Sequence, residues 1–488
     1  MTSPLPRPCW IAGKAELGTA ETAETVVRHP FDGSEIATVA VPGSEQVEAA
    51  VAAAADVARD FRNSPSHLRA AALLHVSREL QSRAEEIAET IVAENGKPLK
   101  WARIEVTRAV STFRFAAEEV RRLGGEWQHL DTDPTATGRI AITRRVSRGP
   151  VLGIAPFNFP LNLVAHKVAP ALAVGSPIVI KPAPRTPLSS LILGEIMAGT
   201  ELPPGSFSVL PLPGTAEGNE ATMALVADER LPVVSFTGSG PVGWRIADVA
   251  ARKHVVLELG GNAAAVVCAD YASDADLDHA ASRIATFGNY QAGQSCIAVQ
   301  RVIVDRSVAD RFLPKLLDAV RALKQGDPYD DSVDVGPVVD DAAATRILDW
   351  VHEARAAGAR LLAGGEQDGT SIAPVVLSEV PVDAKVWRDE VFGPVLCVSV
   401  VDGVDAAFDL VDDSPFGLQA GLFTRDITVA FRAAARLDLG GLIVGDVPSY
   451  RADQMPYGGV KGSGTGREGL RSAMTDFTEE RVMVLTGL

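Results

Sequence analysis

The stretch that decides the fold is residues 233–259, VVSFTGSGPVGWRIADVAARKHVVLEL. It opens with an apolar run typical of a buried strand, turns at Thr237–Gly240, and continues as a helical segment to about Ala251. A second apolar run, Val255–Leu259, follows the helix. A strand, a helix and a strand in succession predict a βαβ unit in which the two strands are parallel.

Strand and helix patterns alternate in the same way on both sides of this stretch. Because parallel strands need helices on both faces of their sheet, we expect two doubly wound α/β domains. The first has expected strands at 151–155, 176–180 and 207–210, with helices at 161–174 and 189–197. The second has expected strands at 265–267, 302–304, 395–401 and 421–423, with helices at 309–323 and 342–357.

Other segments are expected to lie outside these repeats. Residues 1–42 predict an arm with short strands, and helical periodicity then predicts helices at 47–61, 66–92 and 101–123. Residues 127–147 alternate polar and apolar side chains, which predicts a two-stranded excursion, and 477–485 is an expected final strand. Since an isolated hairpin is only marginally stable in water, we expect the excursion to pair with another element or subunit.

Composition limits the classes of function. The chain has 488 residues, 47% of them hydrophobic, and a formal net charge of −16, which argues against nucleic acid and anionic membranes as partners. No CxxC pair, signal-peptide pattern or membrane-length apolar run is present, so we expect a cytoplasmic protein without structural disulfides or metal. The four cysteines are Cys9, Cys268, Cys296 and Cys397.

Three side chains framed by glycine or proline suit chemistry on a carbonyl group. Cys296 lies in the segment 293–297, GQSCI, and would act as a thiolate nucleophile. Asn158, in Pro156–Pro160, would donate a hydrogen bond to an oxyanion, and Glu258 would activate water. Local sequence leaves plainer alternatives open: a core cysteine, a turn asparagine, and a glutamate that faces water at a strand end.

A second group of residues follows predicted strands, where open α/β sheets bind their ligands. Lys181 would contact a ribose or phosphate, although a lone lysine is more often a solvated charge. Backbone N–H groups at Gly238 and Ser239 would face a pyrophosphate at the start of a helix, and Gly214 lies at a similar strand end. The full GxGxxG fingerprint with its acidic residue is missing, so this signal is weak by itself.

Taken in order, these motifs resemble the aldehyde dehydrogenase superfamily along nearly the whole chain. Each block is modest alone, but the ordered set is specific. The blocks are Pro156–Pro160, Lys181–Pro182, Phe236–Ser239, Leu257–Gly261, Gly293–Cys296, Glu390–Pro394, and Pro456–Gly459 with Lys461, Ser463 and Gly464.

The resemblance implies an NAD- or NADP-dependent oxidation of an aldehyde to a carboxylic acid. Cys296 would form a thioester, Asn158 would bind the oxyanion, and Glu258 would activate the hydrolytic water. The implied cofactor contacts are Ile154, Lys181, Gly214, Gly238, Ser239, Glu390 and Phe392. The implied domains are a cofactor-binding domain (1–125 and 148–256, with 447–469 returning to it), a catalytic domain (257–446), and an arm (126–147 and 470–488) that pairs subunits into dimers or tetramers.

One departure from the family pattern bears on cofactor choice. Many NAD-preferring members carry a glutamate three residues after the Lys181 position, but this chain has Pro184 followed by Arg185. A missing carboxylate removes a repulsion against a 2′-phosphate, and Arg185 would attract it. We therefore expect NADP to be accepted.

The substrate is less defined by the sequence than the chemistry is. His166, Ser295 and Arg451, with Arg114 as a further candidate, fall on segments that line the substrate tunnel in the family, which favours a small polar or anionic aldehyde. Exposed or ion-paired charges are the plainer interpretation. Two other functions, coenzyme A acylation and non-catalytic binding, stay open as alternatives, although such proteins tend to lack a carboxylate at the Glu258 position or the thiol at the Cys296 position.

Overall fold

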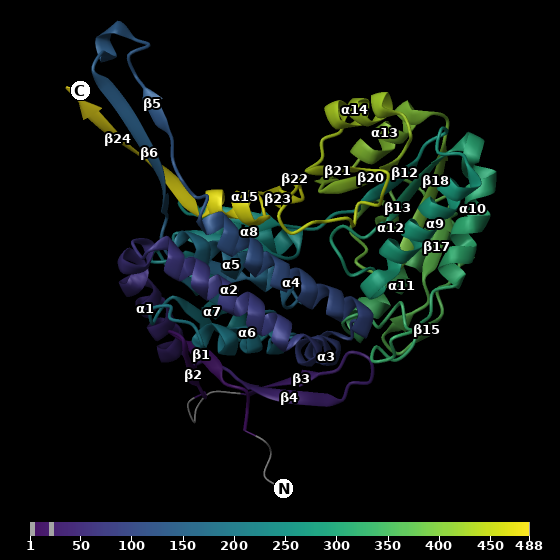
Figure 1. Ribbon diagram of the computed structural model, residues 1–488. Coiled ribbons are helices and arrows are strands. Elements are labelled where there is room, and N and C mark those ends of the chain that lie inside the picture. The colour runs from purple at the N-terminus through teal and green to yellow at the C-terminus, as the bar shows by residue number, and fades with distance from the viewer. Residues whose placement is uncertain (1–4, 19–23, 488) are drawn as a thin grey trace.

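The computed structural model describes residues 5–18 and 24–487, which form two α/β units and a projecting three-stranded arm (Figure 1). This confirms the predicted fold class. Predictions that fall on residues 1–4, 19–23 and 488 lie outside the described residues. Within the described ranges, no helix is both long enough and apolar enough to cross a membrane.

The first unit is built on an eight-stranded sheet in the order β2-β1-β9-β8-β7-β10-β11-β23. Its five central strands are parallel, and β23 joins the edge antiparallel to β11. The strands are β1 (Cys9–Ile11), β2 (Lys14–Glu16), β7 (Val151–Ile154), β8 (Ile178–Lys181), β9 (Phe207–Val209), β10 (Val233–Thr237), β11 (His254–Glu258) and β23 (Gly464–Thr465).

Helices cover both faces of this sheet because nearly all residues of its central strands are buried, and apolar side chains alternate between the two faces. In β8, Ile178 and Ile180 face one core cluster, whereas Val179 faces the other. The first face is covered by α2 (Ser66–Ser82), α3 (Ala84–Asn95), α4 (Leu99–Val120), α5 (Asn162–Val174) and α6 (Leu188–Ala198). The second is covered by α1 (Ser44–Arg62), α7 (Ala216–Ala227) and α8 (Gly240–Val249).

The second unit repeats this design on a seven-stranded sheet in the order β14-β17-β18-β13-β12-β20-β21. Ala264 and Val266 face one cluster and Ala265 and Val267 the other. The strands are β12 (Ala264–Val267), β13 (Arg301–Asp305), β14 (Arg360–Ala363), β17 (Val375–Ser378), β18 (Val395–Val401), β20 (Gln419–Phe423) and β21 (Gly441–Val444). The helices are α9 (Asp274–Asn289), α10 (Arg306–Arg321), α11 (Asp341–Ala356), α12 (Lys385–Arg388), α13 (Val404–Asp412) and α14 (Ile427–Arg436).

The arm consists of β5 (Trp127–His129), β6 (Arg139–Ser147) and β24 (Thr478–Thr486). β24 pairs with β6 along its whole length, so the predicted excursion and the predicted final strand pair with each other. The arm extends away from both units (Figure 1). Apolar side chains on its surface are exposed. These exposed side chains are Trp127, Val482, Met483 and Val484.

The single helix predicted at 66–92 is wrong, because the structure divides it into α2 and α3 at Arg83. No proline or glycine marks this break, and the Arg83 side chain instead pairs with Glu86 and Glu195. The turn residues Asn95–Pro98, which predict the end of this helical segment, are confirmed as its end, since Gly96 ends α3 in the left-handed conformation with φ 71°. Helix α7 was not predicted.

A buried ion pair fixes the start of α5, the helix that leads into the candidate site. Lys97 is bonded to Glu105, and both side chains are fully buried. The other Glu105 oxygen accepts hydrogen bonds from the backbone N–H groups of Leu161 and Asn162 at 2.9 and 3.0 Å. A carboxylate at this end of a helix satisfies free N–H groups and interacts favourably with the helix dipole.

Replacing Glu105 by alanine should therefore destabilise the protein strongly. It leaves the buried Lys97 without its partner and the α5 N–H groups unsatisfied, a loss of about 3–5 kcal/mol in the free energy of unfolding. Thermal denaturation at a fixed scan rate compares this variant with Glu85→Ala, which removes an exposed carboxylate paired with Arg103. Equal losses in the two variants would contradict the role given to Glu105.

Candidate active site

Cys296 lies on a strained loop that follows α9. The short 3-10 turn Tyr290–Gly293 includes two non-glycine residues with positive φ, Gln291 and Ala292, both at 53°. Gly293 continues in the left-handed region at φ 70°, and a Cβ atom there would lie 2.1 Å from the carbonyl oxygen of Gly393. Such conformations persist only where surrounding structure imposes them, and here they press the Cys296 loop against residues 390–394.

The thiol of Cys296 is half-buried, and its sulfur lies 2.9 Å from the hydroxyl oxygen of Tyr457. Burial raises the pKa of Cys296 to about 12, and the hydrogen bond with Tyr457 acts in the opposite direction. Ser295, the preceding residue, is buried and accepts a hydrogen bond from the Tyr290 hydroxyl at 2.8 Å. The three other cysteines, Cys9, Cys268 and Cys397, are buried in the hydrophobic interior.

Asn158 reaches the same loop from the first unit. It follows β7, and its Nδ2 atom donates to the carbonyl oxygen of Gln294 at 3.0 Å. Gln291 in turn donates to the backbone oxygen of Asn158, so two amides join the segments. A side-chain NH2 carries two hydrogens, which leaves one for a further acceptor near Cys296.

Glu258 ends β11, where its backbone pairs with Thr237 on one side and Gly464 on the other. The side chain is 3% exposed, and neither carboxylate oxygen has a hydrogen-bond partner among the described residues. Burial, followed by the nearby charge of Glu468, raises the pKa of Glu258 well above its usual value. Glycine is required at 458, because a Cβ atom there would lie 2.8 Å from Glu258 Oε1.

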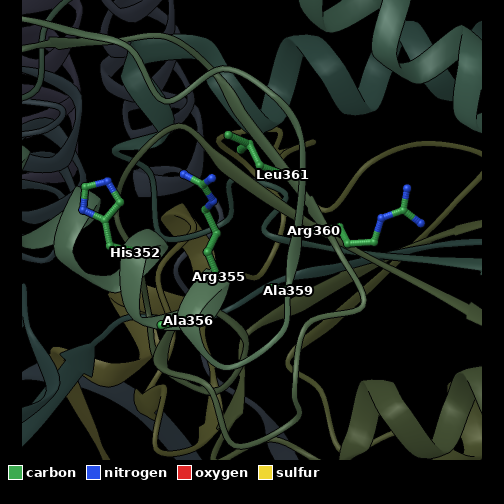
Figure 2. Close-up of a pocket in the computed structure, with 6 residues that line it drawn as sticks. All are labelled: His352, Arg355, Ala356, Ala359, Arg360 and Leu361. Carbon is green, nitrogen blue, oxygen red and sulfur yellow. The ribbon is translucent and has the colours of Figure 1, made fainter.

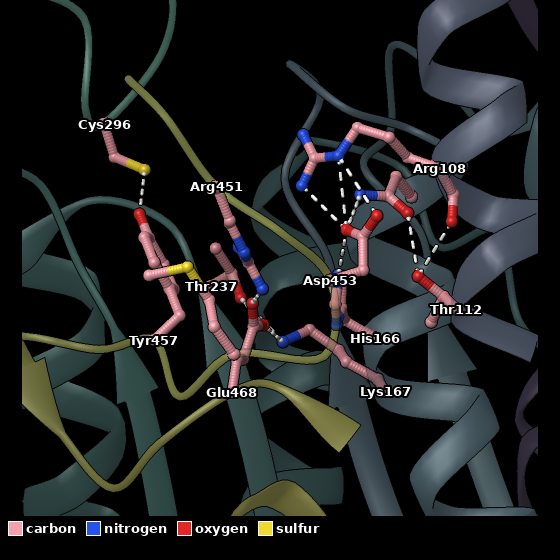
Figure 3. A network of polar contacts seen from close by, with 12 residues as sticks. Arg108, Thr112, His166, Lys167, Thr237, Cys296, Arg451, Asp453, Tyr457 and Glu468 are labelled. Atoms are coloured by element: carbon pink, nitrogen blue, oxygen red, sulfur yellow. Dashed lines mark hydrogen bonds and ion pairs between the residues drawn. The ribbon is translucent and has the colours of Figure 1, made fainter. Parts of the chain in front are cut away.

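Arg451 and Lys167 neutralise the second buried carboxylate, Glu468 (Figure 3). Glu468 accepts from Arg451 Nη2 at 2.9 Å, and Lys167 Nζ lies 3.6 Å from its other oxygen. Burial alone would raise the pKa of Glu468, but these two cations outweigh it and lower the pKa to about 2. Lys167 also donates to the Thr237 hydroxyl at 2.6 Å. Glu468 therefore forms the ion pairs with these two cations, whereas Glu258 forms no ion pair with a described residue and feels their charges only from farther away.

His166 is held within a second polar cluster around Asp453 (Figure 3). Its Nε2 atom lies 3.0 Å from Asp453 Oδ1, and Arg108 Nη2 donates to the same oxygen at 2.8 Å. Burial lowers the pKa of His166, so the imidazole is neutral near pH 7. The structure thus places His166 and Arg451 beside the site, with His166 Nε2 bonded to Asp453 and Arg451 Nη2 bonded to Glu468. It places Arg114 on the exposed face of α4.

Four of the predicted cofactor residues lie at the carboxyl ends of β7, β8 and β10. Lys181 ends β8 and is 8% exposed, and burial lowers the pKa of its amino group to about 8. Its Nζ atom has no hydrogen bond or ion pair with a described residue, which suits contact with a ligand oxygen. Ile154 ends β7, and Gly238 and Ser239 connect β10 to α8.

The remaining predicted cofactor residues come from three loops. The half-buried Glu390 carboxylate accepts from the N–H of Gly261 at 3.1 Å, and loss of solvent contact raises its pKa to about 7. Phe392, at φ 50°, packs edge-on against Phe157 with ring centroids 5.8 Å apart. Gly214 lies beside Pro184 and is exposed. Arg185 is exposed and pairs with Asp340 at 2.6 Å.

Sequence reasoning missed several residues of these clusters. Lys167 was detectable, because a lysine inside the mostly apolar helix α5 must be buried and must find partners. The partners themselves give no local signal, since they lie up to hundreds of residues away. The missed residues are Arg108, Lys167, Asp453, Tyr457 and Glu468.

A separate surface hollow lies between α11 and β14 and contains none of these residues (Figure 2). It is lined by His352, Arg355, Ala356, Ala359, Arg360 and Leu361. The chemistry-bearing side chains are instead gathered between the two α/β units.

Comparison with known proteins agrees with this arrangement. The profile of the aldehyde dehydrogenase family matches residues 18–483. The chain belongs to this family. It is 41% identical over 467 residues to 3-sulfolactaldehyde dehydrogenase from Priestia aryabhattai, a match that covers 96% of this chain and 95% of that protein. The family assignment makes it an NAD(P)-dependent aldehyde dehydrogenase.

Solved structures of family members superpose over almost the whole chain. Aldehyde dehydrogenase 21 from Physcomitrella patens, determined with its reaction product succinate, has a TM-score of 0.95 and 41% identity and covers 99% of both chains. NADP-dependent glyceraldehyde-3-phosphate dehydrogenase from Bacillus halodurans, determined with NADP, has a TM-score of 0.92, 34% identity and 99% coverage of both. The family fold, including its arm, is therefore present in full.

Proposed function

We propose that this aldehyde dehydrogenase oxidises a small anionic aldehyde to its carboxylic acid through a thioester on Cys296. The observation that carries the proposal is the convergence of Cys296, Asn158 and Glu258 from three distant segments. Asn158 bonds to the Cys296 loop, and the charge of Glu258 acts on the thiol. A nucleophile, an oxyanion donor and a base on one carbonyl are what acyl transfer to water requires.

In the first half of the reaction, the Cys296 thiolate adds to the carbonyl carbon, and the π electron pair moves onto oxygen. The Asn158 amide and the Cys296 backbone N–H donate to this oxyanion, where one donor is worth roughly 2.7–4 kcal/mol. When bound, NAD(P)⁺ supplies the acceptor for the hydride that leaves this carbon. Lys181 and Glu390 are the residues that would hold its two riboses, and the acyl group stays on sulfur.

In the second half, Glu258 removes a proton from water, and the oxygen of that water adds to the thioester carbon. The carbon–sulfur bond then breaks, which releases the acid and returns the electron pair to sulfur. The raised pKa of Glu258 makes its carboxylate a stronger base than an exposed one. A buried carboxylate without a bonded cation is free to accept this proton.

Replacing Glu258 by glutamine should stop the reaction after hydride transfer. Each active site should form about one equivalent of NAD(P)H and then stall as an acyl-enzyme, with turnover reduced about 10²- to 10⁴-fold. Cys296→Ala should give neither product. Stopped-flow absorbance measures NAD(P)H, and intact-protein mass spectrometry measures the acyl-enzyme. Cys268→Ala is the control, because Cys268 is buried in the second unit. NAD(P)H formation by Cys296→Ala would refute the proposal.

Unused hydrogen-bond donors near Cys296 support an anionic substrate. The Asp453 carboxylate accepts hydrogen bonds from Nε and Nη2 of Arg108. No described residue accepts a hydrogen bond from Arg108 Nη1, and the Arg108 side chain is 24% exposed. Arg451 Nε is buried without a partner among the described residues. Both arginine charges act on Tyr290, which contacts Ser295. The names of the three relatives reported above carry an anionic substrate or product, namely 3-sulfolactaldehyde, glyceraldehyde-3-phosphate and succinate.

Replacing Arg108 by glutamine should raise KM for a carboxylate-bearing semialdehyde about tenfold or more, because a hydrogen bond to a charged group is lost. KM for propionaldehyde, which lacks the charge, should change little. Arg114→Gln on the exposed face of the same helix is the matched control and should alter neither value. An unchanged ratio of the two KM values in Arg108→Gln would contradict an anionic substrate.

Pro184 supports acceptance of NADP by this chain, whereas Arg185, the other residue predicted to favour it, is paired with Asp340. Pro184 packs beside Gly214 and close to Lys181, so the loop carries no carboxylate that would repel a 2′-phosphate. The B. halodurans relative was solved with NADP.

Pro184→Glu should therefore lower kcat/KM for NADP at least about tenfold relative to NAD, whereas Pro184→Gln tests the same shape without the charge. A strong NAD preference in the unchanged protein would refute this expectation.

We also propose that the first unit binds the cofactor, that the second carries the nucleophile, and that the arm joins subunits into dimers or tetramers. The exposed apolar side chains on β5 and β24 support a partner for the arm. A reducing, cytoplasmic setting is supported by the four free cysteines.

A further inference from the structure

Tyr457 is the side chain that touches the candidate nucleophile. Its hydroxyl oxygen lies 2.9 Å from the Cys296 sulfur, and both residues pack in one hydrophobic cluster with Ile297 and Leu418. The backbone of Tyr457 is fixed by two hydrogen bonds with Glu468, at 3.0 and 2.7 Å. The ring therefore has little freedom to turn away from the sulfur.

Once the Cys296 thiol has ionised, the Tyr457 hydroxyl must be the donor of this hydrogen bond, because a thiolate has no proton to donate. Burial raises the pKa of Tyr457 well above its usual value, so the hydroxyl keeps the proton that it needs to donate. A hydrogen bond to an ionised acceptor is about twice as strong as one between neutral groups. This contact therefore favours the thiolate over the thiol.

Arg451 lies over the face of the Tyr457 ring (Figure 3). Its guanidinium carbon is 3.8 Å from the Tyr457 ring centroid, and Glu468 holds it there. Although burial opposes the charge, Glu468 raises the pKa of Arg451, so the guanidinium is a permanent cation. A cation over an aromatic face attracts its electrons, which makes the phenolic O–H a stronger donor.

The other groups around the sulfur do not provide this stabilisation. Burial and the charges of Glu390 and Glu258 raise the pKa of Cys296, whereas Tyr457 and then Arg451 lower it. The titratable or charged groups that face the sulfur are Tyr457, Tyr290, Arg451, Glu258 and Glu390.

We propose that Tyr457 is a further catalytic residue, which donates its hydroxyl to the Cys296 thiolate, and that Arg451 is a positioning residue, which holds and polarises that ring. The proposal rests on the nucleophilic role of Cys296 proposed above. Arg451 then serves the nucleophile through Tyr457, in addition to any contact with substrate.

Alkylation of Cys296 by iodoacetamide, without substrate or cofactor, measures this effect. Tyr457→Phe keeps the ring under Arg451 and removes only the hydroxyl, which should raise the thiol pKa by about one to two units. A less acidic thiol gives a more nucleophilic thiolate, so the rate at a fixed pH below the pKa should fall by a net ~3- to 10-fold. Mass spectrometry of the peptide that contains Cys296 follows the reaction.

Tyr290→Phe is the matched control, since it removes a buried hydroxyl that bonds to the neighbouring Ser295 instead of the sulfur. It should leave the alkylation rate unchanged. Arg451→Gln should slow alkylation in the same direction as Tyr457→Phe. An unfolded variant is recognised by alkylation of Cys9, Cys268 and Cys397, which are buried in the folded protein; if Tyr457→Phe unfolds, Arg451→Gln decides.

Unchanged alkylation in Tyr457→Phe, or equal slowing in Tyr290→Phe, would overturn the proposal. This failure is separable from failure of the proposed function, because thiol reactivity is measured without turnover. If Cys296→Ala still transfers hydride, the proposed function fails whatever the alkylation rates are.

Discussion

The site depends on how two buried carboxylates, Glu258 and Glu468, and the half-buried Glu390 share too few buried cations. Glu468 is bonded to Arg451 and lies near Lys167, whereas Glu258 has neither cation and no hydrogen bond from a described residue. An isolated charge in such a setting is strongly disfavoured, so Glu258 shifts its pKa upward instead. Glu390, bonded to one backbone N–H, shifts in the same direction. The same environment therefore holds Glu468 as an ionised carboxylate and, beside it, Glu258 with a raised pKa that makes it a stronger base.

The same cations also connect the carboxylates to the thiol. Arg451 bonds to Glu468 on one side and lies over Tyr457 on the other, and Tyr457 reaches the Cys296 sulfur. A change at Arg451 would thus alter the acidity of the nucleophile and the charge near the base together. Such a shared group couples the two titrations, so the pH dependence of the enzyme belongs to the cluster and not to single residues.

Backbone geometry, more than contacts between the side chains, fixes the positions of these groups. The left-handed residues Gln291, Ala292 and Gly293 direct the Cys296 loop, and Gly458 leaves the space that Glu258 fills. β23 returns the chain to the first sheet and pairs Gly464 with Glu258. The loop that carries Arg451, Asp453 and Tyr457 is therefore stretched between the two units and closes the site.

The sequence by itself determined the two α/β units, and it predicted polar side chains at strand ends and Cys296, Asn158 and Glu258 as the catalytic candidates. Apolar runs and glycine or proline turns are local features, so they are readable along the chain. Only the tertiary structure decided four other features: the helix break at Arg83, helix α7, the hydrogen bond between His166 and Asp453, and the place of Arg108 in the site. Whether a buried charge is free or neutralised depends on partners that folding brings together, and Arg108 and Asp453 are 345 residues apart.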